Sequence, residues 1–308
     1  MHVTLRQLQV FMALAQSHSF SQTGQALGLT QSAVSRAMVE LEGQLNVRLL
    51  DRTTREVLLT QAGQLLTQRV APLLQELADA LDEVADVGQA ARGVVRVASS
   101  PTLSAALMPA CIATCSRDLP EVQLQLVDRL QQEVLAQVRN GDVHFGVVVE
   151  PPELGDLEHV TLLHDPFVAV LPASHALVRG QADSAAITLG WAQLQGLPLV
   201  LLDHASGSRR LMDSALLAHG CGPAHCPVVQ EVGHVTTAFR MVEAGIGISI
   251  MPRLAIPPQG LPGLLVADLT PQVERAIMLV RRRQRSLPAA AQAVWDRMAN
   301  LLIHPQRQ

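Results

Sequence analysis

A predicted helix between positions 31 and 45 carries a row of hydrogen-bonding side chains at its front end, while its other side is apolar. In DNA recognition, glutamine can pair with adenine, arginine with guanine, and serine with several base edges or a phosphate. A helix that only packs in a core has no need of such a row, so the pattern predicts contact with a polar, grooved surface. The polar row is Gln31, Ser32, Ser35 and Arg36, and the apolar side is Val34, Ala37, Met38, Leu41 and Leu45.

The residues before this helix are typical of a helix-turn-helix. A second helix is predicted over 22–27, with Ser21 as its N-cap and Gly28 just past its end, and Thr30 is predicted to cap the third helix. Two short helices joined by a tight turn form this motif, and the second of them enters the DNA major groove by its N-terminal residues. The first predicted helix repeats Leu5, Leu8, Phe11, Met12 and Ala15 at helical spacing.

Two arginines in a polar turn are predicted to contact the DNA backbone. Short apolar runs at 48–50 and 57–59 flank this turn, which carries Arg52 and Arg55, and together they predict a small wing. Such contacts position a protein on DNA without reading its sequence. The alternative is a solvated hairpin whose charges only aid solubility. The predicted DNA-binding set is Ser21, Thr30, Gln31, Ser32, Ser35, Arg36, Arg52 and Arg55.

A long helix is predicted from 61 to about 89. Apolar residues recur along it at spacings of four and three, which is a heptad seam. A lone helix cannot bury such a seam, so we predict pairing with the same helix of a second copy; the alternative is a helix lying on its own domain. Pro72 should kink or offset this helix. The seam is Leu66, Val70, Leu73, Leu77, Ala80, Val84 and Val87.

The rest of the chain alternates predicted strands with predicted helices, which implies parallel sheets with helices on both faces, in two α/β lobes. Ligands bind near the carboxyl ends of strands in such folds. Free N–H groups and hydroxyls after the strand at 94–98 suit a carboxylate or another anion, although the hydroxyls could be simple helix caps. The predicted effector set is Ser99, Ser100, Pro101, Thr102, Asp203, His204, Gly207, His234 and Thr236.

The four cysteines do not form a disulfide framework in a chain of 308 residues. The segment HGCGPAHC at 219–226 contains metal-binding residue types, but its spacing is not that of a standard finger, so we predict no metal. A redox switch through Cys221 and Cys226 is an alternative, and it requires a reactive thiolate. Cys111 and Cys115 share one helix face and are interpreted as core residues.

Composition limits the class of protein. The chain is 48% hydrophobic and 16% charged, with a net charge of -4, and all 23 basic residues are arginine. This balance excludes a chain coated for nucleic acid, although a small basic patch remains possible. No catalytic motif is present, so we expect neither enzymatic activity nor a cofactor. The N-terminus does not resemble a signal peptide and no apolar run reaches membrane-spanning length, so we expect a cytoplasmic protein with no membrane partner.

These segments resemble the LysR-type transcriptional regulators. The match is dense at the N-terminus, in LRQLQVF, SFS, ALGLTQSAVSR and RLLDRTTREVLLTQAG, and looser in GDVHFGVV, LPASHAL, SGSRRL and MVEAGIGISIMP. One departure is Thr23-Gly24, where the family usually has two alanines; glycine keeps the close fit but costs roughly 1 kcal/mol of helix propensity.

The resemblance implies a periplasmic-binding-protein-like effector domain, a dimer formed by the long helix, and a tetramer. It also implies that effectors often meet the loop at 99–102, and that a cysteine pair in the second lobe serves peroxide-sensing members.

We therefore predict an α/β protein with an all-α winged helix-turn-helix domain at 1–60, a dimerisation helix at 61–90 and a two-lobed effector domain at 91–308. Lobe I spans about 91–164 and 268–308, and lobe II about 165–267. The predicted function is a homodimeric, or homotetrameric, regulator that binds double-stranded DNA at two-fold half-sites under control of a small anionic or carboxylate effector. The alternatives are a thiol-based redox regulator using Cys221 and Cys226, and a solute-binding receptor with a helical appendage.

Overall fold

The computed structural model describes residues 3–52, 57–85, 92–179, 187–283 and 285–303. By its internal contacts the chain divides into two compact units, Met1–Val87 and Gly88–Gln308. Within the described residues, no helix is both long and apolar enough to cross a membrane.

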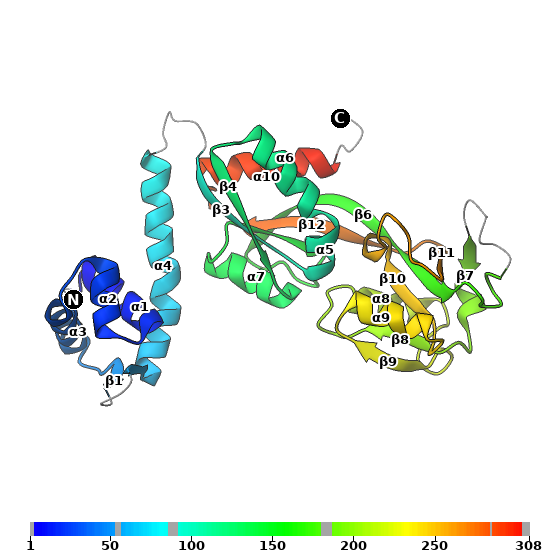
Figure 1. Ribbon diagram of the computed structural model, residues 1–308, viewed down its shortest axis with the longest axis horizontal. Coiled ribbons are helices and arrows are strands. Elements are labelled where there is room, and N and C mark those ends of the chain that lie inside the picture. The colour runs from blue at the N-terminus through cyan, green and yellow to red at the C-terminus, as the bar shows by residue number, and fades with distance from the viewer. Residues whose placement is uncertain (1–2, 53–56, 86–91, 180–186, 284, 304–308) are drawn as a thin grey trace. The chain divides into compact units, whose positions relative to one another are not determined.

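The N-terminal unit consists of three packed helices, a two-stranded wing and a long helix (Figure 1), as predicted. Its buried core comes from α1, α3 and the start of the wing, and comprises Val10, Phe11, Leu14, Val34, Met38, Leu41, Leu49 and Leu50. The elements are α1 (Leu5–Ser17), α2 (Phe20–Leu27), α3 (Gln31–Leu45), β1 (Leu50–Arg52), β2 (Val57–Leu59) and α4 (Gln61–Ala85).

The caps of α2 and α3 agree with the prediction at two of three positions. Thr30 accepts the N–H of Ala33 at 3.2 Å, and Gly28 ends α2 with a φ of 64°. The prediction that Ser21 caps α2 was wrong, because Ser19 accepts the N–H of Gln22 and the helix begins at Phe20. The helix starts earlier because Thr23 is fully buried and its hydroxyl donates to the carbonyl of Ser19 at 2.8 Å.

The first strand of the wing begins later than predicted, at Leu50 instead of position 48. The carboxylate of Glu42, on α3, accepts the N–H groups of Leu49 and Leu50 at 2.7 and 3.2 Å. These bonds attach the entry of the wing to α3, so cross-strand pairing starts only at Leu50, opposite Leu59.

Replacing Gly24 with alanine is expected to destabilise the N-terminal unit. A Cβ at this position would lie 2.7 Å from the carbonyl oxygen of Leu29, which is backbone of the turn before α3. Overpacking typically costs about 1–3 kcal/mol, whereas the gain in helix propensity is only about 1 kcal/mol. We expect a net loss of about 1 kcal/mol, measured as a lower urea midpoint of the full chain.

Gly43 provides a matched control for this prediction. It lies on the exposed side of α3, and a Cβ there would meet nothing within 4 Å. Gly43→Ala should therefore raise stability by up to about 1 kcal/mol through propensity alone. Equal stabilisation by both substitutions would show that the turn before α3 can move aside.

Helix α4 continues through Pro72 to Ala85. The first two apolar residues of the predicted seam are packed within the chain itself, because Leu66 packs against the N-terminal core and Val70 is 8% exposed. Leu73 and Leu77 are instead 59% and 41% exposed. The side chains of Ala80 and Val84 and the whole of Val87 lie outside the described residues, so pairing of this seam between copies stays a prediction.

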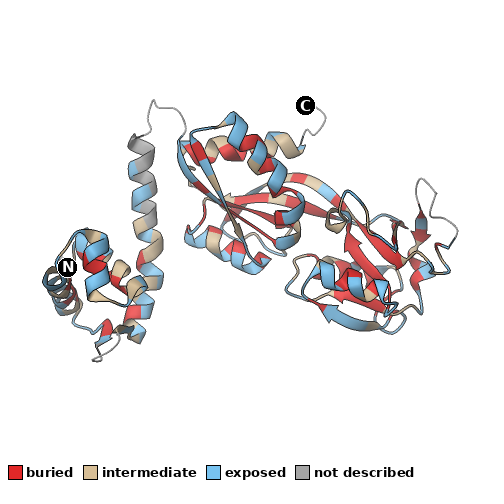
Figure 2. Cartoon of the chain, viewed as in Figure 1, coloured by how far each residue is buried: buried red, intermediate tan, exposed pale blue. Residues whose placement is uncertain are grey.

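The effector unit contains two α/β lobes, with buried residues concentrated on the strands (Figure 2). The first lobe is built from β3 (Gly93–Ser99), α5 (Pro101–Ala106), α6 (Met108–Asp118), β4 (Val122–Asp128), α7 (Gln131–Asn140), β5 (Phe145–Val149) and α10 (Ala289–Ile303). The second is built from β7 (Thr188–Gly190), β8 (Leu199–Leu202), α8 (Arg209–Ala218), β9 (Val228–Val232), α9 (Val235–Glu243), β10 (Ser249–Pro252) and β11 (Leu264–Thr270), with single 3-10 turns at Trp191–Leu194 and Arg253–Ala255.

Two strands cross between the lobes, β6 (Leu157–Pro172) and β12 (Glu274–Arg282) (Figure 1). The first part of β6 pairs with β12, and its second part pairs with β10 and β11, in every case antiparallel. The predicted parallel pairing is present where β3 runs beside β4 and β5 and where β8 runs beside β9. The crossing strands add antiparallel pairs that the prediction did not include, so the large sheet is mixed. The lobe limits near 164 and 268 stay a prediction.

The chain between β3 and β4 forms two helices, α5 and α6, that meet at Leu107. Pro109 follows within the first turn of α6. Proline has no N–H group to continue a helical ladder, so it is tolerated at the start of a helix and breaks the interior of one. The break leaves α5 as a short helix directly after β3.

Candidate functional site

The polar front of α3 faces solvent in the N-terminal unit. Gln31, Ser32 and Arg36 are exposed and Ser35 is half-buried, so all four can reach a partner. Ser32 shares a 3.0 Å hydrogen bond with Thr30, and Gln31 accepts a long bond of 3.5 Å from Ser21. Of the two predicted wing contacts, the side chain of Arg52 and the whole of Arg55 lie outside the described residues.

Hydrogen bonds from α1 hold this front in place. Gln7 closes a capping box with Thr4, and its side-chain amide donates to Glu40 of α3 at 3.2 Å. Arg6 donates to the carbonyl of Leu27, at the end of α2, at 3.1 Å. The turn between α2 and α3 is thereby attached to α1, and α3 presents its N-terminal half outward on a fixed scaffold.

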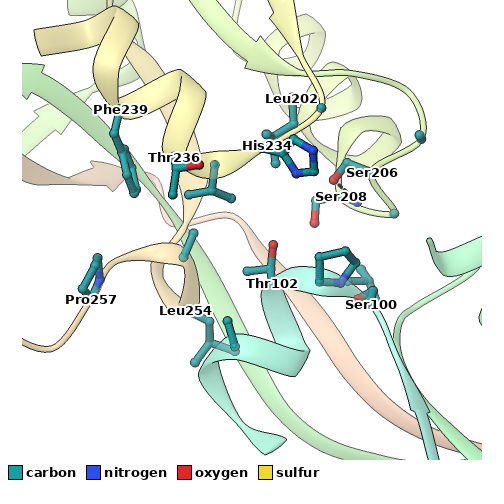
Figure 3. A pocket seen from close by; sticks show the side chains of 18 of the residues that line it. Ser100, Thr102, Leu202, Ser206, Ser208, His234, Thr236, Phe239, Leu254 and Pro257 are labelled. Carbon is teal, nitrogen blue, oxygen red and sulfur yellow. Dashed lines mark hydrogen bonds between the residues drawn. The ribbon is translucent and has the colours of Figure 1, made fainter. Parts of the chain in front are cut away.

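A cavity of about 540 Å³ lies between the two lobes of the effector unit (Figure 3). Lobe I contributes the β3–α5 connection, the start of α7 and the end of β5. Lobe II contributes the β8–α8 connection, the start of α9 and the segment from Leu254 to Leu264. Its volume is within the range of small-molecule sites.

Six of the nine predicted effector residues line this cavity, namely Ser100, Pro101, Thr102, Gly207, His234 and Thr236. They come from three segments at the carboxyl ends of β3, β8 and β9, and the first segment is more than 100 positions from the other two. The structure thus brings together segments that the sequence could only place at corresponding ends of two lobes. Their contact with a ligand stays a prediction.

The other three predicted residues lie elsewhere. Ser99 is fully buried on β3, and its carbonyl accepts the N–H of Arg129 at 3.1 Å. Asp203 accepts the N–H of Ala205 at 3.0 Å and so closes the loop that follows β8. The side chain of His204 is 69% exposed, 3.8 Å from Asp213 and outside the cavity.

A buried ion pair borders the cavity through Arg275, and sequence reasoning did not find it. Arg275 on β12 donates to the carboxylate of Asp165 on β6 at 2.9 and 2.8 Å, and both side chains are only 2% exposed. A third bond runs from Nη1 of Arg275 to the hydroxyl of Ser208. Burial lowers the pKa of Arg275, and the charge and hydrogen bonds of Asp165 oppose that shift. The pair joins both crossing strands to a loop of lobe II.

A second arginine fixes that loop. Arg209, the first residue of α8, donates to Asp213 at 2.7 Å, to Glu231 at 2.6 Å and to the carbonyl of Leu202 at 2.7 Å. Burial opposes its charge, but the hydrogen bonds to both carboxylates raise its pKa. The loop between β8 and α8 is therefore held at both ends while its centre faces the cavity.

At the centre of this loop, Gly207 lies against Gln131 of lobe I. A Cβ at Gly207 would collide with the side-chain amide of Gln131, whose oxygen accepts the N–H of Val149 at 3.0 Å. Only glycine permits this approach between the lobes.

Two family models match the chain. The LysR substrate binding domain matches residues 88–302, and the model of the bacterial regulatory helix-turn-helix proteins of the lysR family matches residues 5–64. The chain belongs to the LysR family of transcriptional regulators. Its N-terminal unit is thus the DNA-binding part of a LysR-family regulator, and its second unit is the effector-binding part.

Relatives align with this LysR-family chain over nearly its whole length. YfeR of Shigella flexneri, an uncharacterized HTH-type transcriptional regulator, is 50% identical over 297 residues, which is 96% of this chain and 93% of YfeR. A full-length OxyR variant from Pseudomonas aeruginosa has a TM-score of 0.71 at 21% identity, covering 98% of this chain and 95% of its own. CbnR complexed with its target DNA has a TM-score of 0.67 at 21% identity, covering 97% and 98%. At these identities the two structures show the shared fold alone.

Cys221 and Cys226, the two free cysteines of the second lobe, are both buried. Cys221 donates to the carbonyl of Trp191 at 3.0 Å, and Cys226 to that of Leu194 at 3.3 Å. Burial raises the pKa of Cys221 to about 12, and the hydrogen bond and charge interaction with Cys226 add smaller contributions in the same direction. Among the described residues, no cluster of histidine, cysteine and carboxylate side chains could hold a metal ion. A thiol in this state is a poor nucleophile and metal ligand.

The stability of the protein is expected to fall as the pH rises above about 9. Burial raises the pKa of Cys111 and of Cys221 to about 12, so the folded chain keeps protons that the unfolded chain loses. Each such thiol removes up to about 1.4 kcal/mol of stability per pH unit in this window. Because the chain has no lysine and no tyrosine, few other groups titrate there. Urea unfolding at a series of alkaline pH values measures the slope.

Cys111→Ala provides the control for this pH dependence. Removing one buried thiol should reduce the slope of stability against pH by up to about 1.4 kcal/mol per pH unit. A stability that stays constant across this range would contradict the buried, protonated state of the two thiols.

Proposed function

We propose that this LysR-family regulator binds a small anionic effector in the cavity between its lobes, and that occupancy changes its contact with DNA. The observation that carries the proposal is the cavity itself, which is lined by loops of both lobes. A ligand that touches both lobes has a different affinity for different lobe arrangements, and that difference shifts the equilibrium between them. The solute-binding alternative does not account for the helix-turn-helix match at 5–64.

The DNA site in this proposal has two half-sites, read by two copies of α3. Arg36 and Gln31 address base edges, and Ser32 and Ser35 address bases or phosphates. The two copies pair through α4, where Leu73, Leu77 and Leu81 form an exposed row at a spacing of four and are 59%, 41% and 61% exposed. Apolar rows of this kind are stabilised by a second helix. A tetramer is the further assembly that we propose, with two such dimers.

Effector and DNA must influence each other equally in this scheme. If an effector strengthens or weakens DNA binding by some factor, DNA changes effector affinity by the same factor, because the coupling free energy is shared. Effector titrations with and without the DNA site therefore test the scheme independently of any transcription assay.

Footprinting on the DNA upstream of the gene that encodes this chain, at a stated salt concentration, tests the proposed function. Protection of two half-sites that shifts when a small carboxylic or aromatic acid is added is the expected result. Salt must be held fixed because phosphate contacts make DNA affinity strongly salt-dependent. Absence of protection on any DNA, with ligand binding intact, would overturn the regulatory scheme.

One substitution distinguishes thiol-based redox sensing from effector binding. Cys226 lies beside Cys221, which is the arrangement that favours a disulfide switch, but both thiols are fully buried. Cys226→Ser should leave the effector response of the footprint unchanged. Loss of a peroxide-dependent footprint in this variant would instead support thiol sensing.

A further inference from the structure

The cavity has a polar end and an apolar end (Figure 3). At the apolar end the ring of Phe239 stands across from Leu254 and Pro257. Phe239 and Leu264 belong to a buried core cluster of lobe II, so this wall is fixed by packing. The polar end carries hydroxyls of both lobes, from Ser100, Thr102, Ser206 and Ser208.

Among the described residues, each arginine side chain that lines the cavity forms an ion pair with a carboxylate. Arg275 is paired with Asp165, and Arg240 is paired at the rim with Glu243 at 2.7 Å. One negative charge on a ligand can be held by hydroxyl and guanidinium donors. Neither arginine is left to pair with a second charge inside the cavity, and burying an unpaired charge is costly.

Ser208 is placed to donate to such a charge. Its side-chain oxygen accepts a hydrogen bond from Arg275, so its own hydroxyl hydrogen is directed elsewhere. The hydroxyls of Ser208 and Thr102 point into the space between the lobes (Figure 3), and Ser208 is only 4% exposed. A hydroxyl that accepts from a guanidinium is a stronger donor, because hydrogen bonds in a chain polarise one another.

We propose that the effector is a singly charged amphipathic acid, whose carboxylate accepts a hydrogen bond from Ser208 and whose apolar body lies against Phe239. This inference rests on the proposed function, since it names the ligand class of the same cavity. It excludes dicarboxylates and phosphate monoesters, which carry a second charge. It also excludes sugars, because the wall formed by Phe239, Leu254 and Pro257 would leave most of their hydroxyls without partners.

A matched series of acids tests the class by calorimetric titration of the full chain. Octanoate and 4-phenylbutanoate carry one charge and an apolar body, octanedioate adds a second charge, and butanoate keeps the charge but shortens the body. We expect the first two to bind at least about 10-fold more tightly than the last two. Equal or tighter binding of octanedioate, or no binding of either amphipathic acid, would overturn the proposal.

Substitutions at the polar and apolar ends of the cavity measure how much each end contributes to ligand affinity. Ser208→Ala should weaken octanoate roughly 10- to 100-fold, because it removes a hydrogen bond to a charged group. Phe239→Ala should weaken octanoate but leave butanoate nearly unchanged. Ser214→Ala is the matched control, since Ser214 donates to Arg210 on the outside of the same helix α8. Unchanged octanoate binding by Ser208→Ala would overturn the role of Ser208.

Two further results keep the test decisive. If Ser208→Ala fails to fold, Thr102→Val removes a hydroxyl from the opposite lobe with little change of shape and should also weaken octanoate. Footprinting separates this proposal from the general one: a shift caused only by a dicarboxylate or a sugar overturns the amphipathic acid and leaves the regulator intact. Octanoate binding without any DNA protection would instead support the amphipathic acid as the ligand class and overturn the regulatory scheme.

Discussion

Asp165→Asn should lower the free energy of unfolding of the effector unit by about 3–5 kcal/mol, because it leaves a buried cation without its counter-charge. Arg275 makes two bonds to Asp165, and both side chains are 2% exposed. Asparagine also places an amide donor beside the guanidinium donors. Against a typical total stability of about 5–15 kcal/mol, the loss is large. Urea unfolding followed by circular dichroism measures it.

Two control variants identify the cause of this loss. Asp156→Asn removes a carboxylate from an exposed pair with Arg139 in the same unit, at 3.0 Å, and should cost less than about 1 kcal/mol. The double variant Asp165→Asn with Arg275→Met removes both buried charges and should recover most of the stability. Equal losses of unfolding free energy for Asp165→Asn and Asp156→Asn would mean that the buried ion pair contributes no more to stability than the exposed one.

Arg36→Ala should weaken binding to the specific DNA site by about 1–3 kcal/mol, roughly 5- to 150-fold, and relax specificity at one base position. Arg36 is exposed on the front of α3, and it has no hydrogen-bonding partner within the described residues. Because a base contact contributes little to non-specific binding, affinity for unrelated DNA should change little. Fluorescence anisotropy with specific and scrambled duplexes, at several salt concentrations, gives both affinities.

Arg55→Ala and Arg139→Ala give the contrasting results. Arg55 is predicted from sequence to contact phosphate, so its loss should weaken all sequences alike and reduce the salt slope by about one. Arg139 lies in the effector unit and is paired with Asp156, so Arg139→Ala should leave DNA binding unchanged. A uniform loss for Arg36→Ala on every duplex would assign Arg36 to the DNA backbone instead of the bases.

Local patterns were enough to predict the DNA-binding unit. The cap at Thr30, the end of α2 at Gly28 and the apolar side of α3 each depend on residues within a few positions of one another. The one incorrect cap, Ser21 in place of Ser19, shows the limit of this reasoning. Both serines have the right chemistry, and the burial of Thr23 decided between them.

The same contrast holds for adjacent serines in the effector unit. Ser99 and Ser100 look equivalent in sequence, but Ser99 is the last residue of β3 and is enclosed in the sheet, whereas Ser100 follows the strand and lines the cavity. The strand ends between these two serines, so Ser99 stays in the sheet while Ser100 begins the turn into α5.

The sequence by itself determined the family pattern, the winged helix-turn-helix and the alternation of strands and helices, because periodicity, caps and turns act over short distances. Only the tertiary structure decided the chemistry of the cavity. Asp165 and Arg275 are 110 positions apart, and Ser208 is 67 positions from Arg275. They meet because β6 and β12 pair antiparallel where they cross between the lobes, with Arg275 opposite Asp165. That register depends on how two distant strands pack, and no local segment encodes it.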